Sequence, residues 1–476
     1  MTFSFLPLFL ALRRALPLAT LALAGCGLMR SDYTPPAVTV PVQWQQAQPA
    51  QQGPVTQDPW WTLFQEPALD ELVNQALARN NDLAAAAIRV RRAQLQQGLA
   101  EDALFPDLGG NANVGRDRAL RGDRAITRSN NVGLTVSYEL DLWNRLGSQR
   151  DAARWQALAT EEDRASAALS LSATTVNLYW QLAHINERLV TSQQSIDTAR
   201  LTLRLVQAQF DAGAVSPLDL AEARRNVAAQ EASHTQLLQQ RVEYLNALAI
   251  LFDGPPGQAF ADPRVLPTGE PPAVRAGVPA EVLARRPDLR AAELRLRGLL
   301  ATVDATRASY YPPLTLTGAL GSASTALGNV LQNPVASLGA GLTLPFLRWN
   351  EMRLNTRVSE ADFDEAVVNF RQSLYQSLAD VENALSAREQ STRQNAWLAQ
   401  ALADAREAER LYEIRYRAGA VALRVWLEAQ EQRRTAEIAL ADNRLQRLLN
   451  QVTLYQALGG SDQPVAAEGA TPAATP

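Results

Sequence analysis

The chain contains no lysine, a single cysteine and only two histidines in 476 residues. Its 45 basic residues are therefore all arginine, which excludes a phosphate-loop lysine, a Schiff-base lysine and a serine–lysine nucleophile pair. Cys26, His184 and His234 are too few for a histidine or cysteine metal site, and no HExxH, GxSxG or GxGxxG motif stands in a suitable context. We therefore expect neither an enzyme nor a bound metal or cofactor.

The acidic and basic residues nearly balance, with a formal net charge of −4. Proteins that bind nucleic acids usually carry an excess of basic residues, so this balance indicates that no nucleic acid is a partner. Length alone would suggest about three domains.

An apolar run from Ala15 to Ala24 follows two arginines and ends in the sequence LAGC, whose last residue is Cys26. This order is typical of a bacterial lipoprotein signal, here residues 1–25, with cleavage before Cys26 and a covalent lipid such as palmitate on its thiol. The run is too short to span a bilayer. The alternative is a buried apolar helix with a chance cysteine. Gly27, where lipoproteins kept in the inner membrane tend to have aspartate, favours the outer membrane, and the proline-containing segment 26–62 is expected to be extended.

The sequence repeats itself with an offset of 206 residues. The segment ARNNDLAAAAIRVR, from Ala78 to Arg91, aligns with ARRPDLRAAELRLR, from Ala284 to Arg297. The same offset aligns Pro106 with Pro312, Gly213 with Gly419, Glu222 with Glu428, and Gly254 with Gly460. A constant offset over so many positions indicates an internal duplication.

Each repeat shows the same order of elements: a helix, two strands, a very long helix, a break at a glycine and another helix. The first helices are predicted at 80–105 and 286–311, where each is ended by a proline. The predicted divisions are repeat 1 at 63–253, a proline- and glycine-rich linker at 254–278, repeat 2 at 279–460, and a small polar tail at 461–476 that we expect to be disordered.

Two very long segments contain neither glycine nor proline: Ser148 to Ala212, of 65 residues, and Phe346 to Ala418, of 73 residues. In the first, apolar residues recur in alternating steps of four and three from Leu178 to Phe210, with Ser192 as the exception, which is the pattern of a coiled-coil seam. A helix of this length would extend about 100 Å, far beyond the ~30 Å of a bilayer core. Its many charges place it in water.

Alternation of apolar with polar or small residues predicts four strands. It runs from Val132 to Leu142, from Leu314 to Leu320 and from Leu338 to Phe346, and residues 107–118 form the fourth segment. About 9–11 such residues cross a membrane in a β-barrel, although a soluble sheet with one wet face shows the same alternation. Aromatic residues at one end of the segments resemble the interfacial girdle of membrane barrels: Phe105, Tyr138, Trp143, Tyr310, Tyr311, Phe346 and Trp349.

Four strands are too few to close a barrel, since the smallest membrane barrels have about eight. An open sheet edge in lipid leaves backbone groups unpaired, at several kcal/mol each. If these strands span the membrane, several chains must share one barrel, and the coiled coils must share one hollow cylinder.

Several motifs together resemble the TolC family of outer-membrane efflux ducts, in its OprM/NodT lipoprotein branch. They are LAGC, DYTPP, WWTLFQEPALDELVNQAL, YELDLWNRLGSQRDAA, GVPAEVLARRPDLRAAE and LYQALGG, and they extend from Cys26 as far as Gly460. The resemblance implies an α+β membrane protein: a homotrimer whose twelve-stranded β-barrel, four strands per chain, continues into a long α-helical coiled-coil periplasmic tunnel. It also implies a lipid anchor in the outer membrane, a periplasmic adaptor and an inner-membrane RND-type pump as partners. The implied function is passive export of drugs or other toxic small molecules.

The resemblance assigns the two glycine breaks to helix-hairpin tips at the periplasmic entrance of the tunnel, where Gly213 and Gly419 would allow tight reversals. Asp219 matches an aspartate of the family that hydrogen-bonds a tyrosine matching Tyr416. Two further positions, one helical turn apart, match constricting rings. The expected gate residues are Asp219, Tyr416, Arg424 and Glu428. The alternative is that these are ordinary solvated charges and a packed ring.

Two other functions are compatible with the sequence. One is a structural coiled-coil lipoprotein without a pore, against which the strand pairs with aromatic ends argue. The other is the duct of a type I protein-secretion system, because ducts of this shape carry diverse cargoes and the pump selects the cargo.

Overall fold

The computed structural model describes residues 30–46, 59–122, 126–260, 262–272, 274 and 277–460. The predicted signal at 1–25, Cys26 and the predicted tail at 461–476 lie outside these residues. The chain forms two compact units. The first takes its described residues from Met1–Val38, Ile88–Glu162 and Ala291–Gln372, and the second from Thr39–Ala87, Asp163–Arg290 and Ser373–Pro476. Each unit therefore draws on both sequence repeats.

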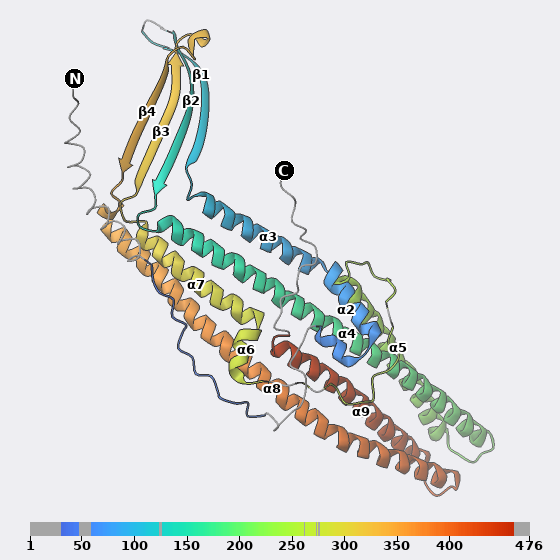
Figure 1. Ribbon diagram of the computed structural model, residues 1–476. Helices are drawn as coiled ribbons and strands as arrows, with labels where there is room; N and C mark the ends of the chain where they lie inside the picture. Colours follow the sequence, from blue (N-terminus) through green and yellow to red (C-terminus); the bar gives the residue numbers. More distant parts are fainter. Residues whose placement is uncertain are drawn as a thin grey trace, which may run out of the picture. The chain divides into compact units, whose positions relative to one another are not determined.

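The first unit contains a four-stranded antiparallel sheet, drawn as four adjacent arrows in Figure 1. The strands follow one another across the sheet in chain order. Their bounds are β1 Asp107–Arg118, β2 Ile126–Leu140, β3 Leu314–Ser324 and β4 Pro334–Leu342. The four predicted strand segments are confirmed.

Some strand ends differ from the prediction. β4 ends at Leu342 and not at Phe346, because Pro345 has no N–H for the ladder and begins the 3-10 helix η3 (Pro345–Leu347). β2 begins at Ile126, before the predicted Val132, because its ladder with β1 continues through a polar stretch where the apolar alternation is lost. Backbone pairing therefore extends beyond the apolar alternation at the start of β2 and ends before it at the end of β4.

Helices enter and leave this sheet at the same end. α3 (Asn81–Asp102) leads into β1, and α7 (Pro287–Ala308) leads into β3. The long helices α4 (Arg145–Asp211) and α8 (Trp349–Arg417) begin shortly after β2 and β4, and both contribute residues to both units. No helix among the described residues combines the length and the apolar character needed to cross a membrane.

The helix bounds confirm the internal duplication. α5 (Pro217–Leu251) and α9 (Leu423–Ala457) begin and end 206 residues apart, and so do α3 and α7. α2 (Pro67–Arg79) and α6 (Pro279–Arg285) also end at equivalent positions. α3 and α7 end three residues before the predicted ends at Phe105 and Tyr311, whose N–H groups instead close short turns ahead of the prolines.

The second unit contains an aromatic core beside the 3-10 helix η1 (Trp60–Phe64). The rings of Trp60 and Tyr455 stack with centroids 5.0 Å apart, and Phe64 lies 5.6 Å from Trp180. Burial raises the pKa of the Tyr455 phenol to about 12. Trp60 and Phe64 of the WWTLF segment thus pack against α4 and α9 and hold the early part of the chain in the second unit.

Candidate functional site

The register of the sheet sorts its side chains onto two unlike faces. Residues paired directly across a ladder share a face, as Leu134 does with Gly110 on β1 and Leu320 on β3. One face is apolar along all four strands: Leu108, Ala112, Val114, Val132, Leu134, Val136, Tyr138, Leu140, Leu314, Leu316, Leu320, Ala336, Leu338, Ala340 and Leu342. Thr, Ser, Asn and Gly dominate the opposite face. An apolar face backed by a small, polar one is the pattern of a membrane barrel.

The two outer strands pair on one side only within the described residues, β1 with β2 and β4 with β3. Along the free edge of each strand, alternate backbone N–H and C=O groups therefore have no partner strand in the described part of the chain. In lipid such groups cost several kcal/mol each unless another strand pairs with them. A single copy of this sheet is not stable in a membrane.

Aromatic side chains lie at the end of the sheet where the helices begin. The ring centroids of Trp143 and Tyr311 are 5.0 Å apart, and the Trp143 indole N–H donates to the carbonyl of Pro312 at 2.9 Å. Phe105 and Trp349 are 66% and 62% exposed in the single chain. Exposed rings with polar contacts beside them are typical of the boundary between lipid and water.

The turn from β2 into α4 explains the motif YELDLWNRLGSQRDAA, which the sequence offered only as a family resemblance. The Asp141 carboxylate accepts the backbone N–H groups of Leu146 at 3.1 Å and Gly147 at 2.7 Å, and so caps the start of α4. Arg145 binds Glu139 through two hydrogen bonds of 2.7 and 3.1 Å. These contacts fix the direction in which the long helix leaves the sheet.

The turns that end α4 and α8 have the same backbone conformation. Gly213 and Gly419 have φ values of 72° and 71°. Each glycine N–H donates to a carbonyl three residues earlier, and the next residue donates to a carbonyl five residues earlier, which is a Schellman helix end. A positive φ is strained for other residues, so this geometry explains why glycine stands at both turns.

The helices after the two turns begin differently. Ser216 caps α5: its Oγ accepts the Asp219 N–H at 3.3 Å, and the Asp219 carboxylate accepts the Ser216 N–H at 2.9 Å. The equivalent residue at the start of α9 is Ala422, whose side chain makes no cap. A missing cap costs about 1 kcal/mol, so the second hairpin is held less firmly at this point.

The ends of both hairpins pack together in the second unit. We call this group of buried residues the tip cluster: Val206, Leu220 and Ala223 from the first hairpin, and Tyr416, Leu423 and Trp426 from the second. The rings of Tyr416 and Trp426 stack with centroids 5.2 Å apart. The two hairpins of one chain are therefore joined at their ends by apolar contacts.

Tyr416 and Asp219 are not paired as the resemblance implied. The Tyr416 hydroxyl donates to Gln209 Oε1 at 2.7 Å, while the Asp219 carboxylate is occupied by Ser216. The expected hydrogen bond from Tyr416 to Asp219 is wrong for this chain, because the Tyr416 hydroxyl has one hydrogen and donates it to Gln209. Burial, and then the charge of Asp219, raises the pKa of the Tyr416 phenol.

Arg424 and Glu428 lie one turn apart on α9, as expected, and form an ion pair with each other at 3.4 Å. Their side chains are 71% and 61% exposed. An exposed pair of this kind contributes less than about 1 kcal/mol. Neither residue belongs to the tip cluster, so the four predicted gate residues do not form one group within the chain.

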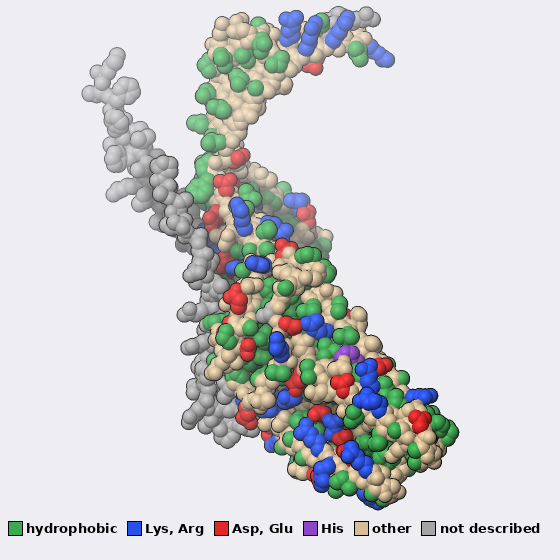
Figure 2. All heavy atoms as spheres, turned by 90° about the vertical axis from the view of Figure 1, so that its right-hand side faces the viewer, with side chains coloured by type: hydrophobic (Ala, Val, Ile, Leu, Met, Phe, Trp, Pro, Cys, Tyr) green, Lys and Arg blue, Asp and Glu red, His purple; other side chains and the backbone are tan. Residues whose placement is uncertain are grey.

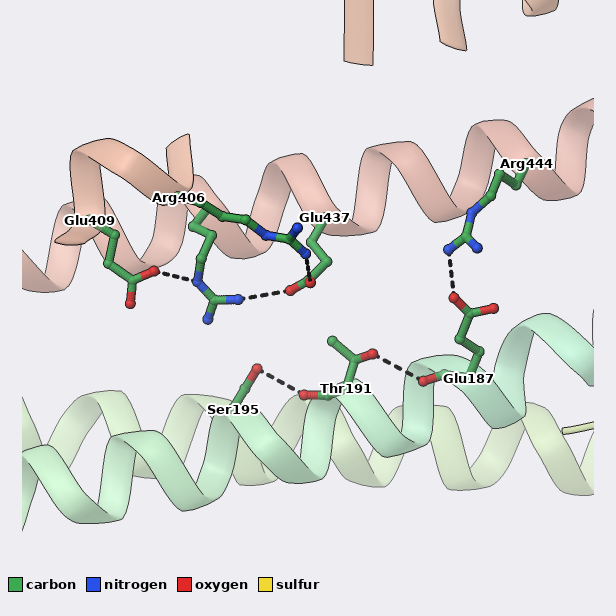
Figure 3. A network of polar contacts seen from close by, with 8 residues as sticks. Glu187, Thr191, Ser195, Arg406, Glu409, Glu437 and Arg444 are labelled. Carbon is green, nitrogen blue, oxygen red and sulfur yellow. Dashed lines mark hydrogen bonds and ion pairs between the residues drawn. The ribbon is translucent and has the colours of Figure 1, made fainter. Parts of the chain in front are cut away.

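A polar network in the second unit links α4, α8 and α9, as Figure 3 shows. Arg433 and Arg406 both bind Glu437, at 2.8 and 2.9 Å. Arg444 binds Glu187 of α4 at 2.5 Å. The sequence analysis did not single out these charges, although Arg444 and Glu187 connect the two hairpins and the Glu437 pairs join α8 to α9.

Comparison with known proteins gives consistent matches. Residues 72–252 and 278–460 match the family described as outer membrane efflux protein. The chain is 35% identical over 466 residues to the pyoverdine export outer membrane protein OpmQ of Pseudomonas putida, covering 94% of this chain and 97% of that protein. The solved outer-membrane channel OprN is 28% identical with a TM-score of 0.82, covering 91% of this chain and 99% of that one. The Campylobacter jejuni CmeC outer membrane channel is 25% identical with a TM-score of 0.80, covering 91% and 94%.

Proposed function

This chain belongs to the outer membrane efflux protein family, and from that membership we propose that three copies of it form one duct across the outer membrane and the periplasm. At the level of the family, the predicted fold class, function and location are confirmed: the chain is an outer-membrane channel of an efflux system. The family and its solved members are channels and not enzymes.

The open sheet with one apolar face is the observation that carries the proposal of three copies. Four strands cannot enclose a pore, whereas three chains supply twelve, a number within the range of membrane barrels. β1 and β4 run in opposite directions, so β4 of one copy can pair antiparallel with β1 of the next. This arrangement satisfies the backbone groups at every free edge.

We propose that the long helices of the three copies continue the pore as a tunnel through the periplasm. A periplasmic adaptor and an inner-membrane RND-type pump would meet the tunnel at its free end. The pump would select the cargo, drugs or other toxic small molecules, because a passive duct needs no catalytic group. The helices support this role through their charged surfaces, which suit an aqueous compartment.

Electrophoresis of the purified full chain without boiling tests this assembly. We expect a band at the mass of a trimer that heating converts to monomer, because strand pairing between chains holds the barrel together. The unheated protein should conduct ions in planar bilayers. A monomer before heating, with no conductance, would instead support a coiled-coil lipoprotein without a pore.

We also propose that Cys26 carries a lipid. The chain shortly after it is held on the first unit: Ser31 donates its N–H and Oγ to Asp304 at 2.8 and 2.6 Å, and Arg30 pairs with Asp151 at 3.2 Å. Asp304 lies near the end of α7 that leads to β3. A connection of five residues reaches at most about 18 Å, so this attachment of Ser31 is compatible with an acyl chain on Cys26 that enters the membrane beside the sheet.

Mass spectrometry of the N-terminal peptide from membrane-purified protein tests the anchor. The peptide should begin at Cys26 and carry the added mass of a diacylglyceryl group and an amide-linked fatty acid. The Cys26→Ser variant should retain the signal and lack these masses. Recovery of unmodified Cys26 with residues 1–25 still attached would contradict the proposal.

We propose that the tip cluster closes the tunnel entrance. Tyr416 contributes through packing, and Asp219 contributes by capping α5. Arg424 and Glu428, exposed on α9, are available to line the opening. Because the cluster joins the two hairpin ends of each chain, changes that loosen it should raise single-channel conductance in bilayers.

A further inference from the structure

The β1–β2 hairpin extends beyond the rest of the sheet. Its ladder continues to the pair Arg118 and Ile126, whereas the pairing of β2 with β3 stops at Asn130 and Ser324. The outermost part of the hairpin is therefore a two-stranded ribbon, at the end of the sheet away from the helices (Figure 1).

This ribbon carries three arginines on one face, Arg116, Arg118 and Arg128. Arg116 pairs directly with Arg128, and strand residues two apart share a face, so the three continue the row of Ala112 and Val114. They therefore lie on the apolar face of the sheet, beyond its continuous apolar band, with Ile126 opposite Arg118 as the one apolar residue among them. Figure 2 shows basic side chains gathered at this end of the sheet, next to hydrophobic ones.

The charges of the three arginines are not balanced on their own face. All three are exposed, and among the described residues none of them forms an ion pair with an acid. Asp117 alternates with Arg116 and Arg118 along β1 and so lies on the opposite face. Like charges directly across a ladder are destabilising, so Arg116 and Arg128 favour an anion between them.

The position of the arginines along the strand matches the level of lipid head groups. On β2 the apolar alternation runs from Leu140 to Val132, and on β1 Val114 continues it opposite Asn130. From Leu140 to Asn130 is about 33 Å along the strand at 3.3 Å per residue, or about 25 Å of height at the ~40° tilt of barrel strands. The apolar band of a membrane barrel is about 25 Å tall. The next residues outward on this face are Asn130 and Arg128, so Arg128 lies where the acyl chains end and the phosphates begin.

We propose that Arg116, Arg118 and Arg128 bind the phosphate groups of anionic lipids in the leaflet around the outer end of the barrel. The inference rests on the proposed function, which places this face of the sheet in lipid. A guanidinium offers a planar fork of donors that binds two phosphate oxygens at once. The apolar residues below contact the acyl chains of the same lipid, so the surface favours a membrane lipid over a soluble phosphate.

The test uses the full-length oligomer in a neutral detergent, titrated with lipopolysaccharide as a phosphate-bearing lipid. Its dissociation temperature is read by electrophoresis. Lipid should raise this temperature for the unmodified chain, and the combined variant Arg116→Gln, Arg118→Gln and Arg128→Gln should need about ten times more lipid for half of the effect. Lysine at the same three positions keeps the charge but loses the fork, so it should give an intermediate value.

A matched control removes three exposed arginines from the helices: Arg92→Gln, Arg204→Gln and Arg225→Gln. This variant should respond to lipid as the unmodified chain does. Phosphatidylcholine, which has no net charge, and free inorganic phosphate should leave the dissociation temperature unchanged.

Two results would overturn the lipid site while leaving the duct intact: an unchanged lipid response in the glutamine variant, or the same stabilisation by inorganic phosphate alone. If the unmodified chain forms no heat-dissociable oligomer even without lipid, the proposed duct fails, and the lipid site fails with it.

Discussion

Replacing Leu338 by arginine is expected to abolish assembly of the oligomer in the membrane. Leu338 lies at the middle of β4 on the apolar face and is 93% exposed in the single chain. Arginine on the lipid face near the membrane centre costs about 2–4 kcal/mol. With three copies in one barrel, the total is about 6–12 kcal/mol, comparable to the whole stability of many domains. Electrophoresis of membrane extracts without boiling measures the loss as a missing oligomer band.

The adjacent residue provides the control. Ser337 lies on the opposite face of β4, where it pairs with Ala319. Ser337→Arg adds the same side chain on the side that would face the pore, so the oligomer should form and its preference for anions should increase. If Ser337→Arg and Leu338→Arg have equal effects on assembly, the assignment of the two faces is wrong.

Truncating Trp426 to alanine should open the hairpin ends. The Trp426 side chain is 5% exposed and stacks on Tyr416 in the tip cluster. Its indole N–H has no hydrogen-bond partner among the described residues, so the loss is mainly packing. Removing a buried tryptophan costs about 3–5 kcal/mol, here confined to the ends of α4, α5, α8 and α9. Single-channel recordings should show a higher mean conductance while the oligomer band remains.

The double variant Asp219→Ala with Tyr416→Phe should produce a smaller increase. It removes the carboxylate half of the α5 capping box and the hydrogen bond to Gln209, worth about 1 kcal/mol each, but it keeps the Ser216 cap and the aromatic ring in place. Arg200→Gln, which breaks only the exposed ion pair with Glu231 and touches no residue of the tip cluster, serves as the stability control. Unchanged conductance in both Trp426→Ala and the double variant would show that the tip cluster does not close the entrance.

The spacing of apolar residues and the positions of glycine and proline predicted most of the helices and strands. The glycine- and proline-free runs predicted α4 and α8, and the constant offset predicted that α5 and α9 would correspond residue by residue. These features are local, because a helix is specified mainly by neighbours within four residues along the chain. The end of β4 was misplaced because Leu344 and Phe346 continue the alternation after Pro345 has ended the ladder.

The contacts of the candidate gate could not be obtained in the same way. Tyr416 and Gln209 are 207 residues apart, and no local pattern indicates that their side chains meet. The role of Asp219 was readable, since serine followed three residues later by an acid at a helix start is a capping signal. One set of ion pairs is also reflected in the sequence. Arg200 and Glu231 in the first hairpin and Arg406 and Glu437 in the second occupy equivalent positions, separated by the repeat offset.

The unequal starts of α5 and α9 have a consequence for symmetry. In the proposed assembly of three chains, six similar turns would surround one opening. Only the three turns that lead into α5 have the serine cap, so capped and uncapped turns would alternate. A force applied evenly to this ring would separate the three uncapped turns first, because each of them lacks the stabilisation of about 1 kcal/mol that a cap contributes. The opening should then widen with threefold and not sixfold symmetry. The internal duplication thus gives the entrance its six similar turns, and the sequence differences between the two repeats determine which turns separate first.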